Sequence, residues 1–157
     1  MSLISPFLWF DSQAEEAANL YVSLFPNSRI SHISHYPEGG PASAGSVMSV
    51  SFVLDGLDIQ ALNGGPQFQF TEAISFFVKV ETQEEVDHYW DSLLADGGTP
   101  SQCGWLKDRF GLSWQIVPTV LGELLGTHDA AAKRAMGAMM SMSKIIIADL
   151  RAAADAG

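Results

Sequence analysis

The chain has 157 residues, 47% of them hydrophobic and 17% charged, and its 8 basic and 18 acidic residues give a formal net charge of −10. This composition provides a buried core and excludes a disordered chain. The negative charge disfavours nucleic acids and anionic membrane surfaces, so we expect neither as a partner. A small neutral or cationic molecule is the ligand class that this charge favours.

The cysteine content and the N-terminal residues indicate the cellular compartment. Cys103 is the single cysteine, so an intramolecular disulfide and a cysteine-based zinc site are both excluded. The segment 1–4 leads directly into a strand-like run, without the basic and apolar regions of a signal peptide. No stretch approaches the roughly 20 apolar residues that a membrane span needs. We therefore expect a cytoplasmic protein.

The first third of the chain predicts a β-α-β-β-β order. Residues 7–10 are an aromatic-rich apolar run typical of a buried strand. Ser12 and Glu15 have the spacing of a capping box, and they precede a helical apolar pattern that ends at Pro26. Further strands are expected at 29–36, 47–54 and 59–62, with a hairpin turn at Asp55-Gly56.

The same order is expected a second time. A strand at 74–80 precedes Thr82 and Glu85, which again have capping-box spacing, and Gly97-Gly98 ends the following helix. The remaining strands of this half are expected at 99–103, 105–109 and 112–117.

The chain changes character after Pro118, where residues that favour helices dominate. Helices are expected at 120–125, 130–142 and 144–154, with Asp129 as the cap of the middle one. The methionines of this segment are more typical of packing than of a cofactor site; they are Met136, Met139, Met140 and Met142.

Two short units recur in the sequence. Gly56-Leu57-Asp58-Ile59-Gln60 returns as Gly111-Leu112-Ser113-Trp114-Gln115, and Ile4-Ser5-Pro6-Phe7 returns as Ile74-Ser75-Phe76-Phe77. Recurrence of this kind predicts an internal duplication. We therefore expect a first module at 1–66, a second at 67–118 and a helical C-terminal extension at 119–157, all in one structural domain.

Several longer motifs identify a family resemblance. They are Pro6-Phe7-Leu8-Trp9-Phe10-Asp11, Leu24-Phe25-Pro26-Asn27-Ser28, Ala61-Leu62-Asn63-Gly64-Gly65-Pro66 and Cys103-Gly104-Trp105-Leu106-Lys107-Asp108-Arg109-Phe110-Gly111. With them the chain resembles the PhnB-like branch of the vicinal oxygen chelate superfamily, a branch often labelled 3-demethylubiquinone-9 3-methyltransferase. The resemblance implies an α+β fold of two tandem βαβββ modules, the glyoxalase/bleomycin resistance/dioxygenase fold, with a helical tail and a homodimer.

The resemblance also implies where a metal would bind. Superfamily ligands lie on the first and last strands of each module, and those positions correspond here to Pro6, Ser75, Gln60 and Gln115. None of them is His, Glu or Asp, and a neutral amide is a weak ligand for a divalent metal. We therefore expect no metal site and no cofactor, and no catalytic residue can be assigned.

The candidate ligand-binding residues each have a second interpretation. Gln60 and Gln115 either hydrogen-bond a ligand in the cleft of the superfamily fold or satisfy buried backbone groups. Trp9, Phe68 and Trp105 are cleft walls or core aromatics, and Asn63 shapes the cleft rim. Cys103 is a small buried residue, or a thiolate if Lys107 or Arg109 approaches it.

His32 and His35 invite a metal interpretation that strand geometry opposes. Positions three apart point to opposite faces of a strand, so the two rings can share an ion only across a bulge. We expect a surface role for both.

Three classes of function remain open at this point. The first is a binding module that sequesters a small ligand. The second is an enzyme of the same superfamily, with metal-dependent lyase, isomerase or dioxygenase chemistry through residues such as His32, or metal-free chemistry through Cys103. The third is a dimer-forming interaction protein with a vestigial cleft. The methyltransferase label is disfavoured, because no glycine-rich turn opens a parallel sheet.

Overall fold

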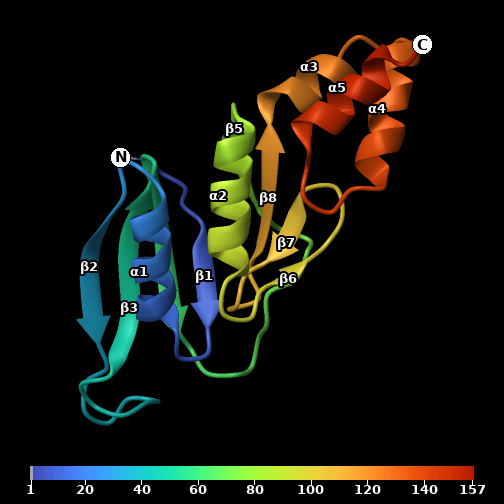
Figure 1. The fold of residues 1–157 in the computed structure, drawn as a ribbon. Helices are drawn as coiled ribbons and strands as arrows, with labels where there is room; N and C mark the ends of the chain where they lie inside the picture. The colour runs from blue at the N-terminus through green and yellow to red at the C-terminus, as the bar shows by residue number, and fades with distance from the viewer. Residues whose placement is uncertain (1) are drawn as a thin grey trace. The chain divides into compact units, whose positions relative to one another are not determined.

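The structure, a computed structural model that describes residues 2–157, has the predicted α+β fold. Contacts divide the chain into two compact units, the first ending at Phe70 and the second beginning at Thr71. Each unit contains one four-stranded mixed sheet, and the strand orders are β1-β4-β3-β2 and β5-β8-β7-β6. Figure 1 follows the chain through both units. The two sheets therefore have the same topology.

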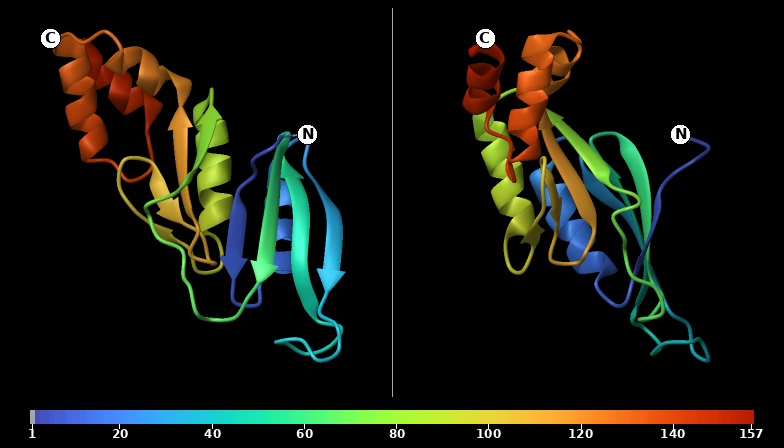
Figure 2. Two further views of the ribbon diagram at one scale, coloured as in Figure 1. Left: turned by 180° about the vertical axis from the view of Figure 1, so that it is seen from behind. Right: turned by 90° about the vertical axis from the view of Figure 1, so that its right-hand side faces the viewer.

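The first unit consists of one sheet and one helix. Its strands pair antiparallel from β2 to β4, while β1 lies parallel to β4. Helix α1 packs against one face of this sheet, and the rear view in Figure 2 shows the strands from the face that the helix leaves uncovered. The elements are β1 (Phe7–Phe10), α1 (Ala14–Leu24), β2 (Arg29–His35), β3 (Val47–Leu54) and β4 (Leu57–Asn63).

The turn between β3 and β4 follows the sequence prediction. Asp55 and Gly56 have φ values of 45° and 83°, so both residues adopt the left-handed conformation that a two-residue hairpin requires. Asp–Gly pairs adopt it readily because glycine lacks a Cβ and aspartate tolerates this region. This tight turn sets the register in which Gln60 pairs with Ser51.

The predicted capping box at the start of α1 is wrong. The helix begins at Ala14, and its N-cap, Gln13, makes no side-chain capping bond. The amide of Ala14 instead donates to Oδ1 of Asn63, 2.8 Å away at the end of β4. The spacing of Ser12 and Glu15 suggested a local cap, but the polar atom that satisfies the helix end comes from a strand 49 residues further along.

The second unit repeats the arrangement, and its three antiparallel strands are shorter than those of the first unit. Strand β5 lies parallel to β8, and β6, β7 and β8 pair antiparallel. Helix α2 packs against β7 and β8 through Val86, Trp90 and Leu93. The elements are β5 (Phe76–Val80), α2 (Gln83–Leu94), β6 (Thr99–Pro100), β7 (Trp105–Lys107) and β8 (Ser113–Pro118).

The capping box of α2 is confirmed. The amide of Glu85 donates to Oγ1 of Thr82, and the Glu85 carboxylate accepts from the Thr82 amide, each at 3.2 Å. The prediction succeeds here because both partners are local in sequence.

The strands expected at 99–103 and 105–109 are shorter than predicted. Cys103 and Gly104 have φ values of 59° and 86°, which a strand does not accommodate. Their amides donate to the carbonyl oxygens of Met142 and Ser143 at 2.8 Å, rather than to a neighbouring strand. The segment between β6 and β7 is therefore a loop bonded to the C-terminal extension.

A buried carboxylate organises the turn from β7 to β8. Asp108 is 3% exposed, and its Oδ1 accepts hydrogen bonds from the amides of Phe110 and Leu112 at 2.9 and 3.0 Å. Its Oδ2 accepts from the indole nitrogen of Trp114 at 2.9 Å. Three donors to one carboxylate make this turn rigid and fix where β8 begins.

The C-terminal extension is helical, as predicted. Its helices are α3 (Thr119–Leu125), α4 (Ala130–Met140) and α5 (Ile147–Asp155), and Oδ1 of Asp129 caps α4 through the Ala132 amide. A small core of Leu121, Ile145 and Leu150 includes Met139 and Met142 at its edge. Two of the four methionines therefore pack as expected, whereas Met136 and Met140 are about half exposed. No helix among residues 2–157 is both long and apolar enough to cross a membrane.

Candidate functional site

Each sheet has one face that its own helix does not cover, and the predicted glutamines lie on these open faces. In the second unit Trp114 and Ile116 are 2% and 0% exposed, so alternation along β8 places Ser113, Gln115 and Val117 on the opposite face. The open face therefore contains the polar residues of β8, of which Gln115 is partly exposed and Ser113 is buried.

Both glutamines pair with a serine. In the second unit Nε2 of Gln115 donates to Oγ of Ser75 at 2.9 Å. In the first unit Nε2 of Gln60 donates to Oγ of Ser5 at 3.5 Å. Each unit thus has one amide–hydroxyl pair, placed between its parallel strands and the residues just before them. In the described structure both amides donate to serine hydroxyls, and neither donates to a buried backbone group as the alternative interpretation expects.

Aromatic side chains flank the glutamine of the second unit. Phe77 on β5 and Trp105 on β7 are the residues that face Gln115 across the two strand pairs. Phe77 is 57% exposed and Trp105 is half-buried. An apolar ring on each side of a polar amide is a typical arrangement for holding a small molecule.

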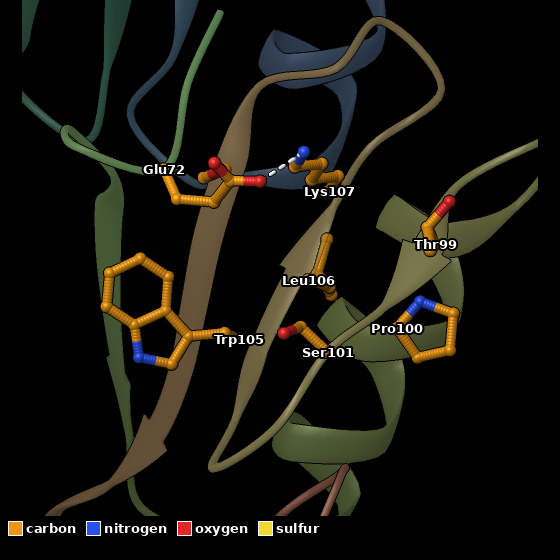
Figure 3. A pocket seen from close by; sticks show the side chains of 8 residues that line it. Glu72, Thr99, Pro100, Ser101, Trp105, Leu106 and Lys107 are labelled. Atoms are coloured by element: carbon orange, nitrogen blue, oxygen red, sulfur yellow. Dashed lines mark ion pairs between the residues drawn. The ribbon is translucent and has the colours of Figure 1, made fainter.

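A pocket of about 280 Å³ lies beside these residues in the second unit. The labelled side chains in Figure 3 show its boundary: Trp105 on one side, Thr99 and Pro100 on the other, and Glu72 with Lys107 at one end. Ser113 also lines it. The register of the sheet explains the set, because Thr99, Lys107 and Ser113 are neighbours across β6, β7 and β8.

The hydroxyl of Ser113 is a buried polar group without a partner in the described structure. The residue is 1% exposed, and its Oγ forms no hydrogen bond there. Buried polar atoms in native proteins are nearly always paired, so an orphan requires an explanation. Ser113 lies in the wall of the pocket, which places this unpaired hydroxyl next to the cavity.

An ion pair closes one end of the pocket. The ammonium of Lys107 contacts Oε1 of Glu72, and their side chains are 41% and 63% exposed. The hydrogen bond from Lys107, with its positive charge, holds the pKa of Glu72 below its usual value. The two opposite charges leave this end of the pocket without net charge.

The predicted binding residues of the first unit have structural contacts. The indole nitrogen of Trp9 donates to the Gly65 carbonyl at 3.0 Å, and the ring meets Phe68 edge to face at a centroid distance of 5.0 Å. A Cβ on Gly64 would lie 2.3 Å from the same indole. Besides capping α1, Asn63 donates to the Val47 carbonyl at 3.1 Å. A ligand-binding role for Trp9, Asn63 and Phe68 stays a prediction.

Cys103 lies in the β6–β7 loop, partly buried. The two cations considered as its activators have acidic partners, since Lys107 pairs with Glu72 and Arg109 lies 3.9 Å from Asp96. These two ion pairs do not include the thiol of Cys103. Its role in binding also stays a prediction.

The residues do not form a set of donors suited to a divalent metal. Among residues 2–157 no group of three His, Cys, Asp or Glu side chains is placed to hold an ion. Strand β2 does contain irregularities at Ile30–His32 and Ser34–His35, the type of bulge that the two histidines would need, but no third ligand joins them. Gln60 and Gln115 pair with the hydroxyls of Ser5 and Ser75 instead.

Comparison with known proteins now identifies the family. The model of the family described as 3-demethylubiquinone-9 3-methyltransferase matches residues 2–117. The chain belongs to this family. A putative 3-demethylubiquinone-9 3-methyltransferase, the PhnB protein from Bacillus cereus, is 37% identical, with 74% of this chain and 99% of that chain covered at a TM-score of 0.69. The PhnB-like assignment within the vicinal oxygen chelate superfamily is confirmed.

More distant structures share the fold. The fosfomycin resistance protein FosX from Listeria monocytogenes is 20% identical, with 80% of this chain and 96% of that chain covered at a TM-score of 0.57. A protein from Pseudomonas aeruginosa is 19% identical, with 75% and 98% covered at a TM-score of 0.62. Among curated proteins, none matches the chain.

Sequence reasoning found part of this site and missed the rest. It selected Gln115 and Trp105, which lie on one face of the sheet opposite each other. It missed Ser113 and Glu72. The only sequence signal for Ser113 is a hydroxyl between the apolar residues Leu112 and Trp114 at the start of a strand.

Proposed function

We propose that this PhnB-like protein binds a small neutral or cationic molecule on the open face of the second sheet. The observation that carries the proposal is the hydrogen bond between Gln115 and Ser75, flanked by Phe77 and Trp105. An amide keeps one further N–H donor and an acceptor oxygen when a single N–H is engaged, so it can orient a polar group while the rings cover the apolar part.

The proposed binding uses hydrogen bonds and no metal. FosX has been crystallised with Mn(II) and a sulfate ion, so that protein holds a metal on a related fold. Here the candidate ligands are the amides of Gln60 and Gln115 on the last strands and the hydroxyls of Ser5 and Ser75 just before the first strands, and these neutral groups bring no charge to offset the desolvation of a divalent ion. These residues therefore do not fit a divalent metal ion.

The family name gives no support for methyl transfer by the common S-adenosylmethionine fold. That fold requires a parallel sheet whose first strand is followed by a glycine-rich turn into a helix. Each sheet here has a single parallel pair of strands among antiparallel ones. We propose a binding protein, and an enzyme of the superfamily is the alternative that turnover would establish. The homodimer also stays a prediction.

Two small probes in metal-free buffer test the proposal. We expect benzamide or benzylammonium to cause saturable NMR shifts of backbone amides in β5, β7 and β8 with the chelator EDTA present. Gln115→Leu should weaken binding about tenfold, because a buried hydrogen bond to the ligand is lost. Gln69→Leu, at an exposed position of the first unit, is the matched control. Shifts that appear only after a divalent metal is added would contradict the proposal.

A further inference from the structure

We infer that the pocket beside Gln115 takes an uncharged molecule with a single ring, whose hydrogen-bonding group meets the hydroxyl of Ser113. The inference rests on the proposed function, because it names the ligand of the same open face. It depends on three features of the pocket: an unpartnered hydroxyl, a cancelled charge and an apolar wall.

The hydroxyl provides the specific contact. Ser113 is 1% exposed, lines the pocket and has no hydrogen-bond partner in the described structure. A hydroxyl can donate one hydrogen bond and accept others, so a carbonyl, an amide or a hydroxyl on the ligand can pair with it. A group that stays unpaired in the ligand-free protein destabilises it, and pairing with a ligand removes that penalty.

Ser113 is buried, but its position on β8 places it on the open face of the sheet, in the wall of the pocket. It follows the rigid turn at Asp108 and lies opposite Lys107 in the antiparallel pair of β7 and β8. Gln115 is two residues further along the same face, about 7 Å away at the rise of a strand. One small molecule can therefore reach both the Ser113 hydroxyl and the Gln115 amide.

The charges around the pocket select against ions. Lys107 and Glu72 neutralise each other at its end. A charged ligand that took either partner would leave the other without its ion pair. Anions are disfavoured a second time, because the net charge of −10 repels them on approach. An uncharged head group avoids both penalties.

The walls and the volume set the size of the ligand. Trp105 forms one side and Pro100 the other, as Figure 3 shows, and both offer apolar surface to a flat ring. The volume of about 280 Å³ is just below the usual range for ligand pockets, which begins at about 300 Å³. A one-ring molecule matches this space.

Three probes of equal size and different charge test the inference. Benzamide, benzylammonium and benzoate share the ring and differ in the head group, and isothermal titration with the 157-residue chain gives their affinities. We expect benzamide to bind most tightly. Ser113→Ala should weaken benzamide binding about tenfold, the loss of one buried hydrogen bond. The same substitution should leave the thermal midpoint of the ligand-free protein unchanged or raise it, because it removes an unpaired hydroxyl.

The control and the opposing outcomes separate the inference from the proposed function. Ser43→Ala, in an exposed loop of the first unit, should change nothing. If Gln115→Leu weakens binding but Ser113→Ala does not, the ligand lies on the open face outside the pocket and the inference is wrong. Tighter binding of benzylammonium than of benzamide overturns the inference and leaves the proposed function standing. Tighter binding of benzoate overturns both, because the proposed function excludes an anion. Failure of all three probes at millimolar concentration overturns both.

Discussion

The two units have the same strand order, yet they build their sheets to different lengths. Strands β2 and β3 of the first unit have 7 and 8 residues, whereas β6 and β7 of the second have 2 and 3. Short strands leave backbone and side chains of the β6–β7 region around a hollow, and the 280 Å³ pocket lies there. The same topology can therefore accommodate long central strands in one unit and a pocket beside short strands in the other.

The units also stabilise their helices differently. Helix α1 depends on Asn63, which belongs to the last strand of its sheet, so its cap exists only when the sheet has formed. Helix α2 has a capping box made from its own first turn. In the first unit the side chain of Asn63 therefore links the start of the helix to the sheet. In the second unit the cap of the helix does not depend on the sheet.

The largest effect is expected from a substitution in the turn between β7 and β8 of the second unit, which Asp108 organises. Asp108→Ala should lower the free energy of unfolding by about 3 kcal/mol, because three donors, two of them buried, lose a charged acceptor. Urea unfolding followed by tryptophan fluorescence measures it. Asp91→Ala, at an exposed position on α2, should change stability by less than about 0.5 kcal/mol. Equal effects at both positions would show that the turn contributes nothing special.

The difference between the two caps predicts a smaller effect. Asn63→Ala should destabilise the protein by about 1–2 kcal/mol, and Thr82→Ala by about 1 kcal/mol. Ser12→Ala should stay within about 0.5 kcal/mol, because the Ser12 side chain caps nothing. Hydrogen exchange of the first turns of α1 and α2 localises each effect. Faster exchange in α1 after Ser12→Ala would instead support the capping box that the sequence suggests.

The smallest expected effect depends on pH and is specific to the second unit. Asp87 on α2 accepts a hydrogen bond from Gln83 and an ion pair from Lys144 at 2.9 Å, and these contacts hold its pKa below the usual 3.8. A lowered folded-state pKa means that the contribution to stability is present above the unfolded value and is lost as pH falls through the folded one.

Urea midpoints at about pH 6 and about pH 3 measure this contribution. The wild-type protein should lose more stability between the two than Asp87→Asn does. Lys144→Met should reduce the difference only in part, because Gln83 remains the larger influence. Parallel losses in all three proteins would contradict the prediction.

Much of the fold was predictable because its signals are local. The alternation in 47–54 gave β3 its observed bounds, and Asp55-Gly56 is a turn pair of known conformation. The errors have tertiary causes. Residues 101–103 read as strand, but the left-handed Cys103 and Gly104 bond to the carbonyls of Met142 and Ser143, some 40 residues away. The spacing of Ser12 predicts a helix cap, but Asn63 on β4 accepts the hydrogen bond from the first turn of α1.

The site was predictable only where sequence repetition marked it. The recurrent Gly-Leu-x-x-Gln unit led to Gln60 and Gln115, and both have serine partners at equivalent places. Ser113 lies within the same repeated unit, and what makes it a candidate is that its hydroxyl has no hydrogen-bond partner among residues 2–157. The absence of a partner is a property of the packed structure, and no residue pattern encodes it. Glu72 likewise precedes Lys107 by 35 residues in the sequence, and only the folded second unit brings the two side chains together.

The bonds from Cys103 and Gly104 to the C-terminal extension also matter for how relatives of this protein can differ. The family model ends at residue 117, before the extension begins. A member that stops there still needs acceptors for the two loop amides, from water or from a different side chain. It also lacks Ile145, which packs against Gly104. Lengthening or trimming the C-terminus is thus one way for evolution to reshape the β6–β7 loop without altering a residue in it.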